Sequence, residues 1–501
     1  MYIALLHYHL LRGGVSSVIR HQAALLKKAG YQVLLIVGEA SLDLGDIPLA
    51  VVPLLAYDVV RSEWSKSQTK DTPSLKSEDE SPEALAQAIV NAMREQWGRS
   101  ADVIHIHNPL LRKNRLLVPA LELLQKQGLT LLLHNHDFAE DFRPDVYMTD
   151  QNYPENCHYA AINRRDYSFL HRAGLQKEGL HLLPNAVGPL PWTKGLERSR
   201  FVYPVRAIRR KNIGEALLLS LFIPKGTCIT ITLPPAATSP DQIYYQFWKQ
   251  VARELDLPVE FEIGLRENIG DIMGTAQAVL TTSVKEGFGF SFLEPWTADL
   301  PVLGRRIGYI CSDFEAEGIQ FSHLYNSLGI PMVYLSPPLL RKKLEQVLIE
   351  TYEAYHLELE THTLKNLTDD IFSQEVFDFG KLDEEFQMDI IKMAASNSIA
   401  RQDIIDVNPF LEILETWNIR DHDEIIQANK DIILKHYSME NTQHQLQMTY
   451  TKVTSTTVQH KISKSVLLEL FLDPLKLFPV GITRKSAGFR NIQVDSAEPP
   501  R

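Results

Sequence analysis

Short apolar runs alternate with amphipathic stretches along the first part of the chain. Residues 2–6 are apolar, Gly13 and Gly14 form a turn, and residues 15–28 carry apolar side chains at helical spacing. Three more apolar runs of strand length lie at 32–38, 102–107 and 129–134, the last two separated by a helical pattern over 118–126. Strands and helices in this order predict right-handed β-α-β units that build a parallel sheet.

The same alternation starts again after a segment rich in Pro and Gly at 182–191. Strand-like runs occupy 201–205, 228–233, 259–263 and 278–282, and helices are expected to begin near residues 214, 239 and 292. Two such α/β units joined by a hinge predict two Rossmann-like domains that face each other across a cleft. Ligands should bind in this cleft, because they bind outside the carboxyl ends of parallel strands.

Two segments depart from this alternation. Residues 62–82 are almost all polar, which predicts a mobile surface loop in the first unit. After about residue 339 the strand signals thin out, and long acidic amphipathic helices dominate. We therefore expect an N-terminal domain over 1–190, a C-terminal domain over 191–340 and a helical C-terminal extension with a tail over 341–501.

Composition and charge narrow the class of protein. The chain has 501 residues, 45% of them hydrophobic, which is typical of a folded globular protein. The balance of 51 basic and 62 acidic residues, a net charge of −11, argues against a nucleic-acid partner. No apolar run approaches the roughly 20 residues of a membrane-spanning helix. The first residues look like a strand rather than a signal peptide, and the three cysteines stand far apart. These features predict a cytoplasmic multidomain enzyme.

The segment 281–303 carries the most chemistry. A strand ends near Thr282, a Gly-Phe-Gly turn follows at 287–289, and a helix comes next. Glycines let the backbone approach a ligand closely, and a helix N-terminus presents free N–H groups to phosphate. Glu286 and Glu294 frame this turn and could accept hydrogen bonds from the hydroxyls of a sugar and a ribose. An ordinary turn with one solvated Glu and one helix-start Glu would have the same composition.

The full pattern of this segment is more specific. Glu-Gly-Phe-Gly at 286–289, Glu294, and Leu-Pro-Val at 300–302 resemble the Glu-x7-Glu motif of retaining glycosyltransferases of the GT4 family. The resemblance implies the GT-B fold, with the acceptor bound by the N-terminal domain and the nucleotide sugar by the C-terminal domain. It also implies that Glu286 contacts the donor sugar near the reacting carbon and that Glu294 binds the ribose hydroxyls. Gly287, Phe288 and Gly289 would then contact the donor.

Two basic or glycine-rich segments resemble the same family. Arg206 and Lys211 lie after a strand and before a helix, like the family's Arg…Lys pair that neutralises the donor diphosphate, although Asn212 stands where the family has glycine. Fixed cations there would stabilise the charge of the departing diphosphate. Gly13 and Gly14 resemble the family's first Gly-Gly loop, which implies a helix N-terminus close to the donor phosphates or to the acceptor. A surface basic cluster and a structural turn are the alternatives for these two segments.

A histidine at the end of a predicted strand completes the resemblance. His136, directly before Asp137, fits the family's histidine that lies against the donor sugar, and His134 is the rival. The hinge also resembles the family's Pro-Asn-Gly-Val, with Ala186 in place of the glycine. Together these segments imply a retaining hexosyltransferase with a nucleotide-diphospho-sugar donor. The family uses UDP, GDP and ADP donors, which the motifs do not distinguish, and we expect a UDP- or GDP-hexose. The family needs no bound metal or cofactor.

The sequence says less about the acceptor than about the donor. Asp137, Arg143 and Arg164 fall near the predicted mouth of the cleft, with Arg165 beside them. These arginines could bind a small anionic acceptor, such as the acceptor of a glucosylglycerate-type synthase. A lipid-linked or cell-envelope acceptor is the alternative.

Other protein classes fit part of the sequence. His105 and His107, together with His134 and His136, form two His-x-His pairs at strand ends, and with Asp137, Glu140 and Asp141 nearby they could bind a metal for hydrolysis. A metal-dependent hydrolase would leave the segment 281–303 without a role. A sugar-nucleotide-binding protein without catalysis is a third class. Glycogen-type phosphorylases share the two-domain layout, but no segment late in the chain matches their pyridoxal-phosphate lysine.

Overall fold

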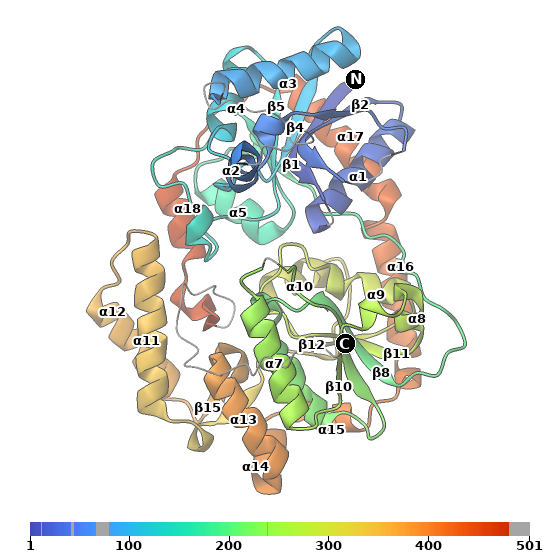
Figure 1. Ribbon diagram of the computed structural model, residues 1–501, viewed down its shortest axis with the longest axis vertical. Coiled ribbons are helices and arrows are strands. Elements are labelled where there is room, and N and C mark those ends of the chain that lie inside the picture. Colours follow the sequence, from blue (N-terminus) through green and yellow to red (C-terminus); the bar gives the residue numbers. More distant parts are fainter. Residues whose placement is uncertain (12, 42–44, 67–79, 238, 480–501) are drawn as a thin grey trace.

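The computed structural model describes residues 1–11, 13–41, 45–66, 80–237 and 239–479. Figure 1 shows two α/β domains, one above the other, with helices from the last third of the chain running alongside both. The fold class predicted from the sequence, two Rossmann-like domains with a helical C-terminal region, is confirmed.

The N-terminal domain is built on a seven-stranded parallel sheet with the order β3-β2-β1-β4-β5-β6-β7. Its strands are β1 (Tyr2–Leu10), β2 (Gln32–Ala40), β3 (Leu49–Val51), β4 (Val103–His107), β5 (Leu131–Asn135), β6 (His158–Ala161) and β7 (Leu180–Leu182). Its helices are α1 (Gly14–Lys28), α2 (Asp58–Lys66), α3 (Pro82–Trp97), α4 (Leu117–Lys126) and α5 (Arg164–Arg172). Strands β1, β4 and β5 lie at the centre, so their carboxyl ends reach the cleft together.

Local sequence signals set the ends of these helices. Helix α3 begins where the Ser81 hydroxyl accepts a hydrogen bond from the Ala84 N–H, with Pro82 in its first turn, and it stops at Gly98 in the left-handed conformation. The predicted loop over 62–82 is only partly right. Helix α2 continues to Lys66, so the first residues of that loop are helical, and 67–79 lie outside the described residues.

The C-terminal domain repeats the plan with a six-stranded parallel sheet in the order β10-β9-β8-β11-β12-β13. Its strands are β8 (Arg200–Arg206), β9 (Cys228–Leu233), β10 (Val259–Phe261), β11 (Ala276–Thr281), β12 (Val302–Arg305) and β13 (Leu324–Tyr325). Its helices are α6 (Ile213–Leu219), α7 (Gln242–Glu254), α8 (Ile269–Gly274), α9 (Glu294–Thr297) and α10 (Gly308–Glu315). A small antiparallel pair, β14 (Gly329–Pro331) with β15 (Val376–Asp378), adjoins this domain.

The segment 337–479 is mainly helical and belongs to the cores of both domains. Its helices are α11 (Pro337–Ala354), α12 (Thr361–Phe372), α13 (Glu384–Ser396), α14 (Ser398–Asp406), α15 (Phe410–Glu415), α16 (Asp423–His436), α17 (Met439–Ser455) and α18 (Lys464–Phe471). Helix α13 packs on α6 and α16 on α9, whereas α17 packs on α1 and α18 on α5. The chain therefore crosses back to the N-terminal domain, which the composition of this region did not indicate. Among the described residues, no helix combines the length and apolar character needed to cross a membrane.

Candidate active site

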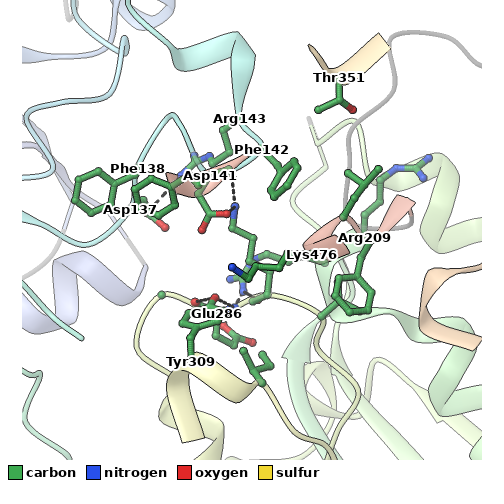
Figure 2. A pocket seen from close by; sticks show the side chains of 18 of the residues that line it. Asp137, Phe138, Asp141, Phe142, Arg143, Arg209, Glu286, Tyr309, Thr351 and Lys476 are labelled. Atoms are coloured by element: carbon green, nitrogen blue, oxygen red, sulfur yellow. Dashed lines mark hydrogen bonds and ion pairs between the residues drawn. The ribbon is translucent and has the colours of Figure 1, made fainter. Parts of the chain in front are cut away.

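A cavity of about 1370 Å³ lies between the two domains. Residues from the loop after β5 line one side, and residues after β8 and β11 line the other, as Figure 2 shows for Asp137 and Glu286. Helix α11 and the segment after α18 also contribute, through Thr351 and Lys476 among others. A pocket for one small ligand usually has about 300–1,000 Å³. This cavity therefore has room for a donor and an acceptor together.

Glu286 forms the centre of a charged cluster on the C-terminal side. One carboxylate oxygen pairs with the Lys211 ammonium, and the other lies 2.6 Å from Arg210 Nη1. Burial opposes ionisation of Glu286, but these two cations outweigh it and lower its pKa to about 2. Burial lowers the pKa of Lys211 to about 8. At neutral pH the carboxylate and both cations are therefore charged.

The predicted cation Arg206 lies elsewhere. It ends β8 with its side chain exposed, and it is not among the described residues that line the cavity. The chain then forms a short turn over 209–211, and Asn212 adopts the left-handed conformation with φ 48° before α6 begins. Asn tolerates this conformation better than most residues, which explains how it replaces a glycine here. The turn brings Arg210, rather than Arg206, beside Glu286.

The two glycines of the Gly-Phe-Gly turn let its backbone pack closely against neighbouring residues. A Cβ atom on Gly287 would lie 2.9 Å from the backbone oxygen of His136, in the opposite domain. Gly289 has φ +91°, and a Cβ there would lie 2.6 Å from Ile310 Cγ2. The Phe288 ring is buried in contact with neighbouring aromatic rings, and it is not a described lining residue. Of the three residues, Gly287 lines the cavity.

Glu294 is the first residue of α9 and is largely buried. No described residue forms an ion pair or a hydrogen bond with its carboxylate, and burial raises its pKa to about 7. Glu294 is not one of the described residues lining the cavity. A buried carboxyl group without a partner has acceptor capacity to offer a ligand hydroxyl.

His136 follows β5 and lines the cavity. Its backbone N–H donates to Asn108 Oδ1 over 2.6 Å, and its Nε2 lies 2.9 Å from His107 Nδ1. Burial lowers the pKa of His136 to about 4, so the ring is neutral at neutral pH. The rival His134 is fully buried and is not a described lining residue. The structure thus puts His136, rather than His134, at the cavity.

The predicted His-x-His pairs do meet: His105 and His107 of β4 lie beside His134 of β5 and His136 just after it, with ring centroids 4.4–5.2 Å apart. Ring nitrogens of His105, His107 and His134 lie within 4.8 Å of one another, a spacing at which they could hold a metal ion. Both nitrogens of His105 already have partners, however: Tyr450 Oη at 2.8 Å and His134 Nδ1 at 3.0 Å. The His105 ring also stacks on those of His107 and His134, with interplanar angles of 27° and 19°. Stacked rings do not direct their nitrogens at one common point. The arrangement therefore fits a buried imidazole network better than a metal centre.

Glu140 and Asp141, two of the carboxylates that could have joined the histidines in binding a metal, interact with other side chains. Glu140 accepts a hydrogen bond from the Tyr153 hydroxyl over 2.7 Å. Asp141 pairs with Arg165 at 3.0 Å and, across the cleft, with Lys285 at 3.2 Å. These contacts make Asp141 a bridge between the two domains.

The predicted acceptor residues divide into two groups. Asp137 and Arg143 line the cavity, with 3.5 Å between Asp137 Oδ2 and Arg143 Nη1. Arg164 is exposed and pairs with Glu317 at 2.5 Å, and it is not a described lining residue. Arg165 does line the cavity, and its guanidinium lies 3.7 Å from the centre of the Tyr309 ring.

Gly13 and Gly14 begin α1, whose first turn has no side-chain cap and no acidic residue. A Cβ atom on either glycine would meet no described atom within 4 Å. Neither glycine is among the described residues that line the cavity, so their part in donor binding stays a prediction.

Several cavity residues were missed from the sequence. The Tyr309 hydroxyl donates to the backbone oxygen of Glu286 over 2.5 Å, and Lys113 comes from the loop between β4 and α4. Neither belongs to a motif, and only the fold brings them to the site. Arg210 and Lys285 could have been found, because each lies next to a predicted site residue in the sequence.

Comparisons with known proteins agree with this geometry. No family model matches the chain. The mannosylglucosyl-3-phosphoglycerate synthase of Petrotoga mobilis is 25% identical over 421 residues, covering 76% of this chain and 79% of that protein. Among solved structures, Anabaena HepE in complex with UDP and glucose has a TM-score of 0.52 at 13% identity, covering 90% of this chain and 99% of that one.

A glycosyltransferase from Rickettsia africae has a TM-score of 0.50 at 12% identity, covering 91% of this chain and 99% of that chain. At these identities the solved structures show the fold alone, which is GT-B. The Petrotoga relative, a synthase, supports a transferase. The chain is a glycosyltransferase with the GT-B fold.

Proposed function

We propose that this chain is a retaining hexosyltransferase of the GT4 type, which moves a hexosyl group from a nucleotide-diphospho-hexose to a small anionic acceptor. The observation that carries the proposal is the buried cluster of Glu286 with Lys211 and Arg210 at the interdomain cavity. Two cations beside one carboxylate leave a net positive charge, which can stabilise a diphosphate. The Petrotoga relative, named as a mannosylglucosyl-3-phosphoglycerate synthase, supports a phosphorylated glycoside as the acceptor.

In this proposal the C-terminal domain binds the donor. Lys211 and Arg210 stabilise the negative charge that develops on the departing diphosphate, and Glu286 orients the hydroxyls of the sugar. Glu294 accepts hydrogen bonds from the ribose. Arg206 is exposed and is not among the described residues that line the cavity, so Arg210 takes the place predicted for Arg206. A UDP- or GDP-hexose fits this scheme, and HepE was solved with UDP-glucose.

The N-terminal domain brings the acceptor to the reacting carbon. His136 contacts the sugar as a neutral ring, so it adds no positive charge beside a sugar that becomes cationic in the transition state. The acceptor hydroxyl attacks from the face that the diphosphate leaves, which retains the anomeric configuration, and the leaving phosphate takes the proton. Contacts across the cleft, such as Lys285 with Asp141, keep the domains close and exclude water that would hydrolyse the donor.

We also propose that the enzyme works in the cytoplasm. Cys157, Cys228 and Cys311 are free thiols, as a reducing compartment favours.

A donor screen tests the proposed function. Thermal unfolding is followed with UDP-, GDP- and ADP-linked glucose and mannose, because a ligand that binds only the folded state raises the melting temperature. The best donor is then incubated with glucosyl-3-phosphoglycerate, and release of nucleoside diphosphate is measured. We expect one donor to stabilise the protein and to support release that depends on the acceptor. Release that is the same without the acceptor would contradict a transferase acting on this compound.

A further inference from the structure

The basic residues that line the cavity differ in how well their charges are compensated. Nine Lys and Arg side chains line it among the described residues. Seven of them have a carboxylate oxygen within 3.2 Å, as Arg210 has Glu286 and Lys285 has Asp141. The other two are Lys113 and Arg143, both in the N-terminal domain.

Lys113 is half-buried, and its ammonium forms no ion pair or hydrogen bond with any described residue. It lies over the Tyr57 ring, 5.5 Å from the centroid, and the ring attracts the charge without neutralising it. Its backbone is held at both ends, since its N–H donates to Leu111 and its carbonyl accepts from Asp58. The backbone of Lys113 is therefore held in place, and its ammonium has no ion-pair partner among the described residues.

Arg143 is almost as poorly compensated. Its nearest carboxylate is Asp137, at 3.5 Å, and that carboxylate also lies 3.4 Å from the Asn108 amide. The Tyr355 hydroxyl accepts from the Arg143 backbone N–H over 2.5 Å, so the end of α11 fixes this loop. Burial lowers the pKa of Lys113, the positive charge of Arg143 adds to this, and Asp137 and Asp145 offset it only in part. Two neighbouring cations thus repel each other at the cavity wall.

We propose that Lys113 and Arg143 form the subsite for the anionic group of the acceptor, and that this group is a phosphate. The proposal rests on the proposed function, which supplies a phosphorylated acceptor. A phosphate dianion between the two side chains would remove their repulsion and accept charge-assisted hydrogen bonds from both. The donor diphosphate has Lys211 and Arg210 in the other domain, which leaves the pair in the N-terminal domain to the acceptor.

Asp137 then has a second role beside this subsite. Its contacts with Arg143 and Asn108 are long, 3.5 and 3.4 Å, so its oxygens keep capacity for a hydroxyl of the acceptor. With the phosphate held by the two cations, that hydroxyl would face the same cavity as His136 and Glu286.

Equilibrium binding tests this subsite without depending on turnover. Glucosyl-3-phosphoglycerate and its dephosphorylated form, glucosylglycerate, are titrated into the wild type, Lys113→Met and Arg143→Gln by calorimetry. The loss of a charged partner should weaken binding of the phosphorylated compound by about tenfold or more in each variant. Binding of glucosylglycerate should change by less than about threefold. Lys476→Met is the matched control, because Lys476 lines the same cavity but is already paired with Asp473 at 2.9 Å.

The outcomes separate the subsite from the proposed function. Equal weakening of both compounds, unchanged binding in both variants, or no binding to the wild type would overturn the subsite. Thermal unfolding with and without the nucleotide-sugar donor checks that each variant is folded. Phosphate-selective binding that depends on Lys113 and Arg143, without transfer from any donor, would support the subsite and contradict the proposed function. Transfer to glucosyl-3-phosphoglycerate with the wild-type KM in both variants would support the proposed function and contradict the subsite.

Discussion

At the scale of single residues, the site combines burial with paired charge. Glu286 keeps a pKa of about 2 although it is buried, because Arg210 and Lys211 lie against its two oxygens. Glu294 has no described partner, and its pKa rises to about 7. Two glutamates eight positions apart therefore carry different protonation states near neutral pH, and each state leads to a prediction.

The first prediction concerns the charged cluster. Lys211→Met should lower kcat by about 100-fold or more, because it removes a fixed charge that stabilises the departing diphosphate. Glu286→Gln should lower it by a similar factor, since it leaves two cations without their carboxylate. Steady-state kinetics with saturating donor measures both. Lys430→Met is the control, because it removes an ion pair with Asp299 and neither residue is among the described residues that line the cavity. A control as slow as the two variants would argue against a specific role.

The second prediction concerns pH. The pKa of Glu294 is about 7 in the folded protein, against an ordinary value of 4.5. The folded state therefore binds more protons than the unfolded state between these values, and this residue makes the ligand-free protein less stable as pH rises from 4.5 to above 7. Glu294→Gln should flatten that part of the profile in chemical denaturation at pH 5, 6, 7 and 8. A variant with the unchanged profile would show that Glu294 does not titrate there.

At the scale of elements, the sequence predicted most of the strands and helices that carry the site. Apolar runs and glycine turns located β1, β4, β5 and the turn after β11, because the periodicity of buried residues is a local property. The motifs in the sequence also pointed to Glu286 and His136, which line the cavity, and to Lys211, which pairs with Glu286. Tyr309 and Lys113 could not be predicted, since only long-range packing brings them near. The exposed Arg206 shows that spacing alone does not say which of several neighbouring arginines turns inward.

The third prediction concerns the turn that precedes α9. Gly289→Ala should lower the free energy of unfolding by about 1–3 kcal/mol, because φ +91° is strained for alanine and its Cβ would overlap Ile310. Gly13→Ala is the matched control: its backbone is extended, with φ 175°, and the space beside it is open. Urea denaturation compares the two. If Gly289→Ala were as stable as Gly13→Ala, the turn would not need its glycine.

At the scale of the whole molecule, the last third of the chain joins the two domains. Leu446, Tyr450 and Val453 of α17 belong to the same hydrophobic cluster as β1 and β2 of the N-terminal domain. Helix α18 adds Leu467 and Phe471 to a second cluster there. Amphipathic patterns predicted helices to about residue 448, so α18 (Lys464–Phe471) lies in what was predicted to be a tail. No local signal says which domain a helix will contact. The predicted extension is therefore also a structural part of the domain where the chain begins.

The fourth prediction measures this contribution. Tyr450 is fully buried, and its hydroxyl lies 2.8 Å from His105 Nδ1. Tyr450→Ala should cost about 3–5 kcal/mol of unfolding free energy, since it leaves a cavity between α17 and the sheet. Tyr450→Phe keeps the ring and should cost only about 1–2 kcal/mol for the lost hydrogen bond. Denaturation of both variants gives the two values, and a cost near zero for Tyr450→Ala would mean that α17 is dispensable for the N-terminal domain.

The stereochemistry of the product tests the central claim most directly. The enzyme is incubated with its α-linked nucleotide-hexose donor and glucosyl-3-phosphoglycerate, and the first product formed is followed by proton NMR. For a retaining hexosyltransferase we expect a new α-linked anomeric signal on the phosphorylated acceptor. It should appear in step with nucleoside diphosphate, and about 100-fold more slowly with Glu286→Gln. A β-linked signal, or free hexose in place of a glycoside, would contradict the account.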